Sequence, residues 1–295
     1  IKIMTVPFAK QISSVDNFDV VVLGGGPSGI MAAAAAAKHG AKTALIEQYG
    51  YLGGMATAGL VAPISVFRYN DELVVGGLPW DFIQRMVTSG GAKVEYPLGN
   101  ISFNPECYKL TAQRLMKELG VITYLHTRLI DCQKNQNRIS HVVLHSKCGL
   151  FALNAKIFID CTGDADLAAL AGIPMLHHEG ELQPASLCFC LGHVDVSSLH
   201  KIHHSQQGIN YHIEDLRKLL IDISAKEQVP EFGGPWMCYM LTDDTVLVNM
   251  TRKKVNIFNE AEATQAEFDM REDAFKLIEI LKNNVPAFSK ASVLY

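Results

Sequence analysis

The sequence lacks several features that would place it in other classes of protein. None of its seven cysteines belongs to a CxxC pair, so the spacing typical of zinc or iron–sulfur ligands is missing and we predict no metal site. No uninterrupted apolar run approaches the ~20 residues needed to span a bilayer. The net charge of −4 provides no general attraction to nucleic acid or to an anionic membrane. We therefore expect neither of these partners.

The few other compositional signals favour an ordinary globular enzyme. The N-terminus lacks the charged-then-apolar layout of a secretory signal. An odd, dispersed set of cysteines is typical of reduced thiols, which predicts a cytoplasmic location. With 295 residues, of which 48% are hydrophobic and 19% charged, the chain can form one or two domains with a substantial core.

The most informative stretch is DVVVLGGGPSGIMAAAAAAKHGAKTALIEQ, residues 19–48. Its apolar opening predicts a buried strand, and the glycines that follow have the spacing Gly24-x-Gly26-x-x-Gly29. In a dinucleotide-binding turn, the first glycine permits the bend, the second admits a diphosphate and the third allows close helix packing. The alanine run predicts that helix, and Gly40 is placed to end it. A glycine-rich turn in an unrelated α/β protein is the less favoured alternative.

A second apolar run, Thr43–Ile46, predicts the next parallel strand, and Glu47 at its end can accept hydrogen bonds from a ribose. The loop that follows, Gly53–Gly59, consists of small residues that leave room for a flat ligand and expose backbone donors. A flexible surface loop is the alternative, and we disfavour it because Met55 and Ala56 are poor choices for solvent.

The rest of the chain indicates a divided α/β fold. Residues 63–103 interrupt the alternation of strands and helices and predict an insertion or lid. A helix from 105 to 119 and a strand from 121 to 125 then restore a parallel sheet. From 128 to 161 the pattern is one of strands and polar turns, with separate apolar runs at 151–155 and 157–161. A Thr-Gly-Asp turn follows, in which Asp166 is expected to cap a short helix.

These patterns predict an FAD- or NAD-binding Rossmann-like domain at 16–62 plus 104–172, followed by an α+β substrate (cap) domain at 173–295. In the second domain, residues 259–282 predict a long helix, and we expect Phe268, Phe275, Ile278 and Leu281 to face inward. Cys188 and Cys190 could form a redox pair on one face of a strand, although two buried thiols are the preferred interpretation.

The choice between the two dinucleotides depends on resemblance. The segments LGGMATAGL and FIDCTGDADLAALAG, with GGLPWDFIQRM, LQPASLCFCLGHVD and VNMTR, resemble the FAD-dependent oxidoreductase family of the glutathione-reductase-like flavoproteins. Its relatives include heterodisulfide reductase flavoprotein subunits. Family members continue with a further strand and helix that cover the flavin, and no such segment precedes Tyr295. The resemblance therefore implies a truncated member with a parallel FAD-binding sheet and a β-meander.

The resemblance also implies the residues that contact FAD. The glycine turn would hold the diphosphate, Glu47 the ribose, the loop from Gly53 the flavin edge, and Leu129 the adenine, while the Thr-Gly-Asp turn would close the site. The predicted cofactor-binding residues are Gly24, Gly26, Pro27, Ser28, Gly29, Glu47, Gln48, Gly53, Gly54, Met55, Ala56, Thr57, Leu129, Thr162, Gly163 and Asp164.

The function that follows is transfer of a hydride between a small organic substrate and the flavin. Arg252 is a candidate for anchoring the substrate or stabilising charge, because a guanidinium grips a carboxylate in a fork; a structural salt bridge is an equal alternative. His178 is a weaker acid–base candidate. Two other functions stay open: an electron-transfer subunit with a redox partner protein, and a non-catalytic nucleotide-binding fragment.

Overall fold

The protein is described here by a computed structural model that covers residue 7 and residues 9–96, 99–176, 183–202, 214–226 and 228–295. Contacts within the chain divide it into two compact units. The first unit comprises Ile1–Gly54 and Ala112–Met175, and the second comprises Met55–Thr111 and Leu176–Tyr295. The segment 63–103, expected as an insertion or lid, thus belongs to the same unit as the C-terminal part of the chain. Its role as a lid stays a prediction.

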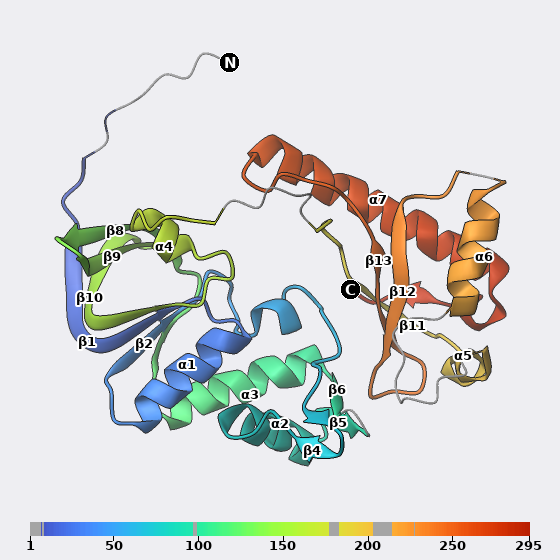
Figure 1. Ribbon diagram of the computed structural model, residues 1–295, viewed down its shortest axis with the longest axis horizontal. Helices are drawn as coiled ribbons and strands as arrows, with labels where there is room; N and C mark the ends of the chain where they lie inside the picture. The colour runs from blue at the N-terminus through green and yellow to red at the C-terminus, as the bar shows by residue number, and fades with distance from the viewer. Residues whose placement is uncertain (1–6, 8, 97–98, 177–182, 203–213, 227) are drawn as a thin grey trace. The chain divides into compact units, whose positions relative to one another are not determined.

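The first unit is built on a six-stranded sheet with the strand order β7-β2-β1-β10-β9-β8 (Figure 1). The first four of these strands are parallel neighbours, whereas β10, β9 and β8 form an antiparallel meander. The predicted α/β class with a parallel sheet and a β-meander is confirmed. The strands are β1 (Ser13–Leu23), β2 (Thr43–Ile46), β7 (Ile122–Tyr124), β8 (Arg128–Asn135), β9 (Arg138–Ser146) and β10 (Gly149–Asp160).

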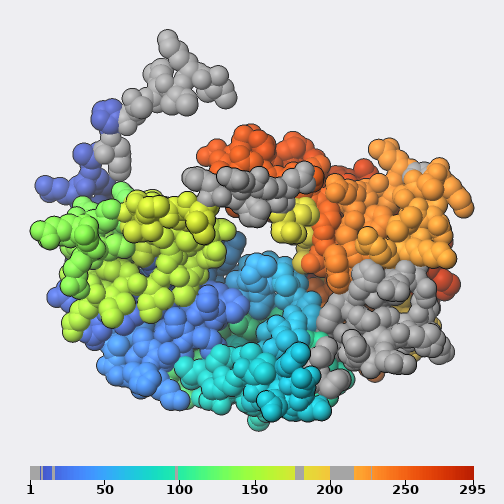
Figure 2. Space-filling view, in the orientation of Figure 1, coloured from blue at the N-terminus to red at the C-terminus, as the bar shows by residue number. Residues whose placement is uncertain are grey.

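The strand β10 joins the two parts of this sheet. The two apolar runs expected as separate strands form one strand of 12 residues. Residues 151–160 pair in parallel with β1, and residues 149–154 pair antiparallel with β9. A single strand can pair with two neighbours because it has two edges. In the first half of β10 one edge pairs with β1 and the other with β9. In the space-filling view the meander and the following helix form one continuous surface (green to yellow-green, Figure 2).

The helix α1 (Pro27–Lys38) packs its small residues on β1 and β2 (Figure 1). Gly29, Ile30, Ala33 and Ala34 form its buried face. At its end Gly40, with φ 85°, donates to the Ala37 carbonyl, and the next amide donates to Ala36. This pair of bonds is a Schellman motif, and the predicted helix end at Gly40 is confirmed. The other helices here are α3 (Pro105–Glu118), which crosses the division between the units, and α4 (Asp166–Leu170).

The second unit contains a four-stranded antiparallel sheet of order β12-β13-β11-β14 and two small hairpins. Its core combines the inner face of this sheet with the long C-terminal helix. Its strands are β3 (Arg68–Tyr69), β4 (Glu72–Leu73), β5 (Ala92–Glu95), β6 (Asn100–Phe103), β11 (Phe189–Gly192), β12 (Phe232–Tyr239), β13 (Val246–Thr251) and β14 (Ser292–Val293). Its helices are η1 (Gly54–Ala56), whose first residue belongs to the first unit, α2 (Leu78–Thr88), α5 (Val196–Ile202), α6 (Glu214–Ser224), α7 (Glu260–Asn284) and η2 (Pro286–Phe288).

The predicted inward face of the long helix is partly wrong. In α7, Ile278 and Leu281 are buried as expected, but Phe268 and Phe275 are 61% and 57% exposed. The buried stripe runs through Ala266, Met270, Ala274, Leu277, Ile278 and Leu281. Two of these six residues are alanines, so a search for large apolar side chains selected Phe268 and Phe275, which lie on the exposed face.

Candidate nucleotide-binding site

The three glycines of the motif have distinct structural roles. A Cβ on Gly24, whose φ is 96°, would lie 2.2 Å from the Cys161 carbonyl oxygen, and one on Gly29 would lie 1.8 Å from the Gly24 oxygen. Gly24 therefore lets the turn approach the backbone of Cys161, and Gly29 lets α1 approach the backbone of Gly24. A Cβ on Gly26 would meet nothing closer than the Gly54 Cα, at 3.9 Å. The space above Gly26 is thus not filled by neighbouring protein, which leaves it available to a ligand.

The start of α1 lies beside this space and is not capped by a side chain. Gly26 is the N-cap residue, Pro27 follows it, and the first turn contains no acidic residue. Amide groups at an uncapped helix start keep their hydrogen-bonding capacity, and the helix dipole favours an anion there. Burial raises the pKa of the Cys161 thiol, and Ser28, also in the first turn, opposes this rise. The arrangement suits a diphosphate group.

Glu47 has a role that the sequence did not reveal. Its buried carboxylate accepts a hydrogen bond from the Gly25 amide and another from the Tyr49 amide, each at 2.8 Å. The side chain therefore fixes the glycine turn against the end of β2. Each carboxylate oxygen can accept a further bond, so this bracing is compatible with the predicted contact to a ribose. The contact itself stays a prediction.

A shallow hollow lies at the carboxyl ends of β1 and β2, which is the edge where open α/β sheets bind ligands. It brings together four of the predicted residues from distant parts of the sequence: Gly24, Gln48, Leu129 and Thr162. Thr127 and Arg128 also line it, and the sequence reading missed them. Their position directly before Leu129 could have identified them, because the first residues of a strand at this edge share its environment.

The Thr-Gly-Asp turn is held by its own side chains. Asp160 accepts hydrogen bonds from the Thr162 hydroxyl, at 2.7 Å, and from the Ala168 amide, at 3.1 Å. The Thr162 hydroxyl in turn accepts a bond from the Asp166 amide. The predicted capping role of Asp166 is wrong, because Ala165 is the N-cap residue of α4 and Thr162 satisfies the amide. Burial, reinforced by nearby Asp164 and Asp160, raises the pKa of Asp166.

The loop after Glu47 divides between the two units. Gly53 donates to the Gly25 carbonyl at 2.9 Å, and a Cβ on Gly54 would lie 2.9 Å from the Gly26 Cα, so both glycines pack on the motif. Met55, Ala56 and Thr57 belong to the second unit. Ala56 and Thr57 are buried, but Met55 is 62% exposed, contrary to the expectation that it avoids solvent. Contacts of these three residues with FAD stay a prediction.

The remaining candidates lie elsewhere in the chain. Arg252 is in the second unit, directly after β13, and His178 lies outside the described residues. All seven cysteines are free thiols, so Cys188 and Cys190 form no disulfide. Burial raises the pKa of Cys188 to about 11, which disfavours the reactive thiolate. Among the helices of the described residues, none is both long and apolar enough to cross a membrane.

Comparison with known proteins agrees with a flavin site. The family described as FAD dependent oxidoreductase matches residues 19–294. A soluble pyridine nucleotide transhydrogenase from Chromohalobacter salexigens is 45% identical over 62 residues, which are 21% of this chain and 13% of that protein. Glutathione reductase from Schizosaccharomyces pombe is 39% identical over 83 residues, which are 23% of this chain and 18% of that protein.

A solved structure extends the similarity in fold to both units. A geranylgeranyl bacteriochlorophyll reductase-like protein from Thermoplasma acidophilum aligns with 95% of this chain and 65% of its own, with a TM-score of 0.58 and 15% identity. The chain spans less than a fifth of the length of the two curated relatives above. At the level of geometry, the open space at Gly26 and the uncapped helix start fit the diphosphate of a dinucleotide.

Proposed function

Because the chain belongs to the FAD dependent oxidoreductase family, we propose that it acts as a flavin-dependent oxidoreductase on a small organic substrate. FAD is the cofactor, and its flavin supplies the site that accepts or donates a hydride. The residues of the chain provide binding and orientation. The redox role with flavin rests on the family, whereas the hydride step and the organic substrate are our proposal.

The open space above Gly26 is the observation that carries this proposal. The diphosphate would accept hydrogen bonds from backbone amides at the start of α1, where no side chain competes. Glu47 would hold the ribose at the end of β2 while its two amide bonds keep the carboxylate in place. The hollow lined by Gln48, Arg128 and Leu129 would receive the adenosine end.

Two other predictions keep their status as proposals. A redox partner protein could receive electrons from the flavin, but no feature of the described residues favours this over an organic substrate. His178 remains a candidate for proton transfer by residue type alone.

Binding of FAD is tested first by comparing ligands that share parts of the cofactor. We expect FAD and ADP to bind competitively, because both carry the adenosine diphosphate that we place in the first unit. Riboflavin, which has no phosphate, should bind at least about 100-fold more weakly, since it gives up the contacts at the helix start. Equal affinity for riboflavin and FAD would contradict the placement of the diphosphate.

The variant Gly26→Ala locates that binding. Its added methyl group has room in the ligand-free protein, where the nearest atom is 3.9 Å away, but it occupies the space proposed for the diphosphate. We expect nearly unchanged thermal unfolding and loss of FAD and ADP binding.

Hydride transfer is then tested by anaerobic mixing of FAD-loaded protein with small amino acids, hydroxy acids and amines. Loss of flavin absorbance with any of them supports the proposal, and failure with all of them contradicts it for these classes.

A further inference from the structure

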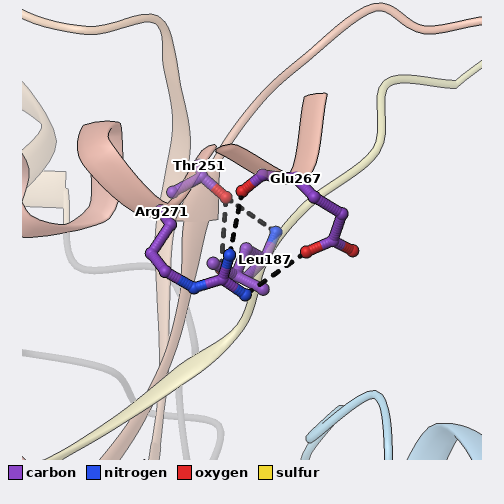
Figure 3. Close-up of polar contacts among 4 residues, drawn as sticks. All are labelled: Leu187, Thr251, Glu267 and Arg271. Atoms are coloured by element: carbon purple, nitrogen blue, oxygen red, sulfur yellow. Dashed lines mark hydrogen bonds and ion pairs between the residues drawn. The ribbon is translucent and has the colours of Figure 1, made fainter. Parts of the chain in front are cut away.

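Arg252 is held in a rigid part of the second unit. It follows β13 directly, and a strap formed by residues 185–188 runs beside it, with Ala185 bridged to Lys253. The hydroxyl of Thr251 accepts a bond from the Leu187 amide at 2.8 Å and donates to the Leu187 carbonyl at 3.1 Å (Figure 3). Thr251 is fully buried. The backbone that carries Arg252 is therefore fixed on two sides.

The guanidinium is positioned by neutral groups only. Its Nη1 donates to the Asn249 Oδ1 at 2.9 Å, to the Thr251 carbonyl at 2.6 Å and to the Ser186 hydroxyl. Its central carbon lies 4.7 Å from the centre of the Trp236 ring. Gly233 packs against it, since a Cβ there would lie 2.4 Å from the Nε atom. The side chain is thus oriented without neutralisation of its charge.

Two other cations of this unit have carboxylate partners. Arg271 pairs with Glu267 at 3.4 Å (Figure 3), and Lys253 pairs with Asp269 at 2.6 Å. Within the part of the chain that the structure describes, no carboxylate forms an ion pair with Arg252, and its Nε and Nη2 atoms have no acceptor. Burial lowers the pKa of Arg252, opposed by Cys188 and Glu231, but arginine remains charged at neutral pH. A partly buried cation without a counter-ion is costly, and an anionic ligand would offset that cost.

We propose that Arg252, supported by Trp236 and Asn249, binds the carboxylate of a small organic acid. This inference rests on the proposed function, in which that acid is the substrate. The ligand class follows from the charge of the site. One guanidinium with neutral neighbours matches the single charge of a carboxylate, and the nearest lysine in sequence, Lys253, is already paired. A phosphate dianion would need a second cation.

The site can be tested without flavin chemistry, because Trp236 contacts the guanidinium. The chain has two tryptophans, so the variant Trp80→Phe leaves Trp236 as the only one. In this background we would titrate benzoate, its uncharged analogue benzamide and inorganic phosphate while recording tryptophan emission, with and without FAD. We expect a saturable change with benzoate and at least about 10-fold weaker binding of benzamide and phosphate.

Three further variants identify the group responsible. Arg252→Gln should weaken benzoate binding by about 10-fold or more, because a charged hydrogen bond is lost. Gly233→Ala keeps the charge but displaces the guanidinium, so benzoate binding should also weaken. Arg271→Gln is the matched control on the surface of α7 and should leave benzoate binding unchanged. Folding of each variant is checked by circular dichroism.

The results separate this inference from the proposed function. Loss of binding in both Arg252→Gln and Gly233→Ala supports the carboxylate site even if FAD does not bind. Equal binding of benzoate and benzamide, tighter binding of phosphate, an unchanged Arg252→Gln variant or no response to benzoate under either condition would overturn it. Those outcomes leave the FAD and ADP measurements untouched, because the residues concerned lie in the other unit.

Discussion

The helices α1 and α7 begin in opposite ways. At the start of α7, the Asn259 side chain accepts bonds from the Ala261 and Glu262 amides, and its own amide nitrogen donates to the Glu262 carboxylate. At the start of α1, Gly26 has no side chain and the first turn has no acid. The start of a helix in the second unit is therefore capped by its own side chain, whereas the helix at the proposed nucleotide site has no side-chain cap.

A second contrast concerns how each unit would hold an anion. The first unit would use backbone amides brought close by glycine, and the second would use one side chain held by neutral neighbours. Backbone sites appear in a sequence as glycine spacing, because close approach requires the absence of a side chain. A side-chain site has no such spacing. Its members Trp236, Asn249 and Arg252 are joined only by the pairing of β12 with β13 and by the turn after β13.

The largest expected effect is a loss of stability on substitution of Gly24, which packs against Cys161, in contrast to Gly26, which we propose faces the diphosphate. Gly24→Ala should destabilise the first unit by about 3 kcal/mol or more, because its Cβ would clash with the Cys161 carbonyl and the residue has a positive φ. Chemical denaturation measures this loss. An unfolding free energy within about 1 kcal/mol of wild type would show that the turn is not packed as described.

The next effect tests the open helix start directly. Gly26 has extended backbone angles, φ −71° and ψ −175°, which suit an N-cap residue of any type. Gly26→Asp should therefore keep or slightly raise the stability of the ligand-free protein. It should weaken FAD and ADP binding by about 100-fold or more, because the new carboxylate repels the diphosphate. Isothermal titration gives the affinity, and tight FAD binding by this variant would contradict the site.

The capped helix provides the converse variant. Asn259→Ala removes the side chain that satisfies two amides of α7, so we expect a loss of about 1 kcal/mol in the free energy of unfolding. FAD affinity should not change, since the cap lies in the second unit. Thermal and denaturant unfolding check the first expectation. A stability equal to wild type would mean that the Asn259 cap contributes nothing.

The smallest effect concerns the outer face of the same helix. Phe268 is 61% exposed, so Phe268→Ser should change the free energy of unfolding by no more than about 0.5 kcal/mol. Met270→Ala, two positions along and buried, should cost about 2 kcal/mol or more. Comparable losses of unfolding free energy for the two variants would contradict the exposed position of Phe268 and support the inward orientation predicted from the sequence.

Much of the first unit could be predicted from residue order. The strand, glycine turn, alanine helix and following strand are contiguous, and each is specified by local chemistry. The same reading divided β10 into two strands, because it could not know that the strand pairs with β1 along most of its length and with β9 in its first half. It also assigned Asp166 as the cap of α4. In the structure the Thr162 hydroxyl accepts a bond from the Asp166 amide, and the Asp160 carboxylate accepts one from the Ala168 amide.

The sequence by itself determined the glycine turn and the helix it starts, because these depend on residues adjacent in the chain and on the absence of side chains. The kind of cofactor was indicated by the resemblance of several segments to a known family. Only the tertiary structure decided that Glu47 braces this turn and that Arg128 lines the hollow beside it. It also decided that the Arg252 guanidinium lies over the Trp236 ring and forms no ion pair with a carboxylate of the described residues. These contacts join segments that are distant in the sequence. Their contributions to the free energy depend on burial and on distances between atoms, which are set only when the chain has folded.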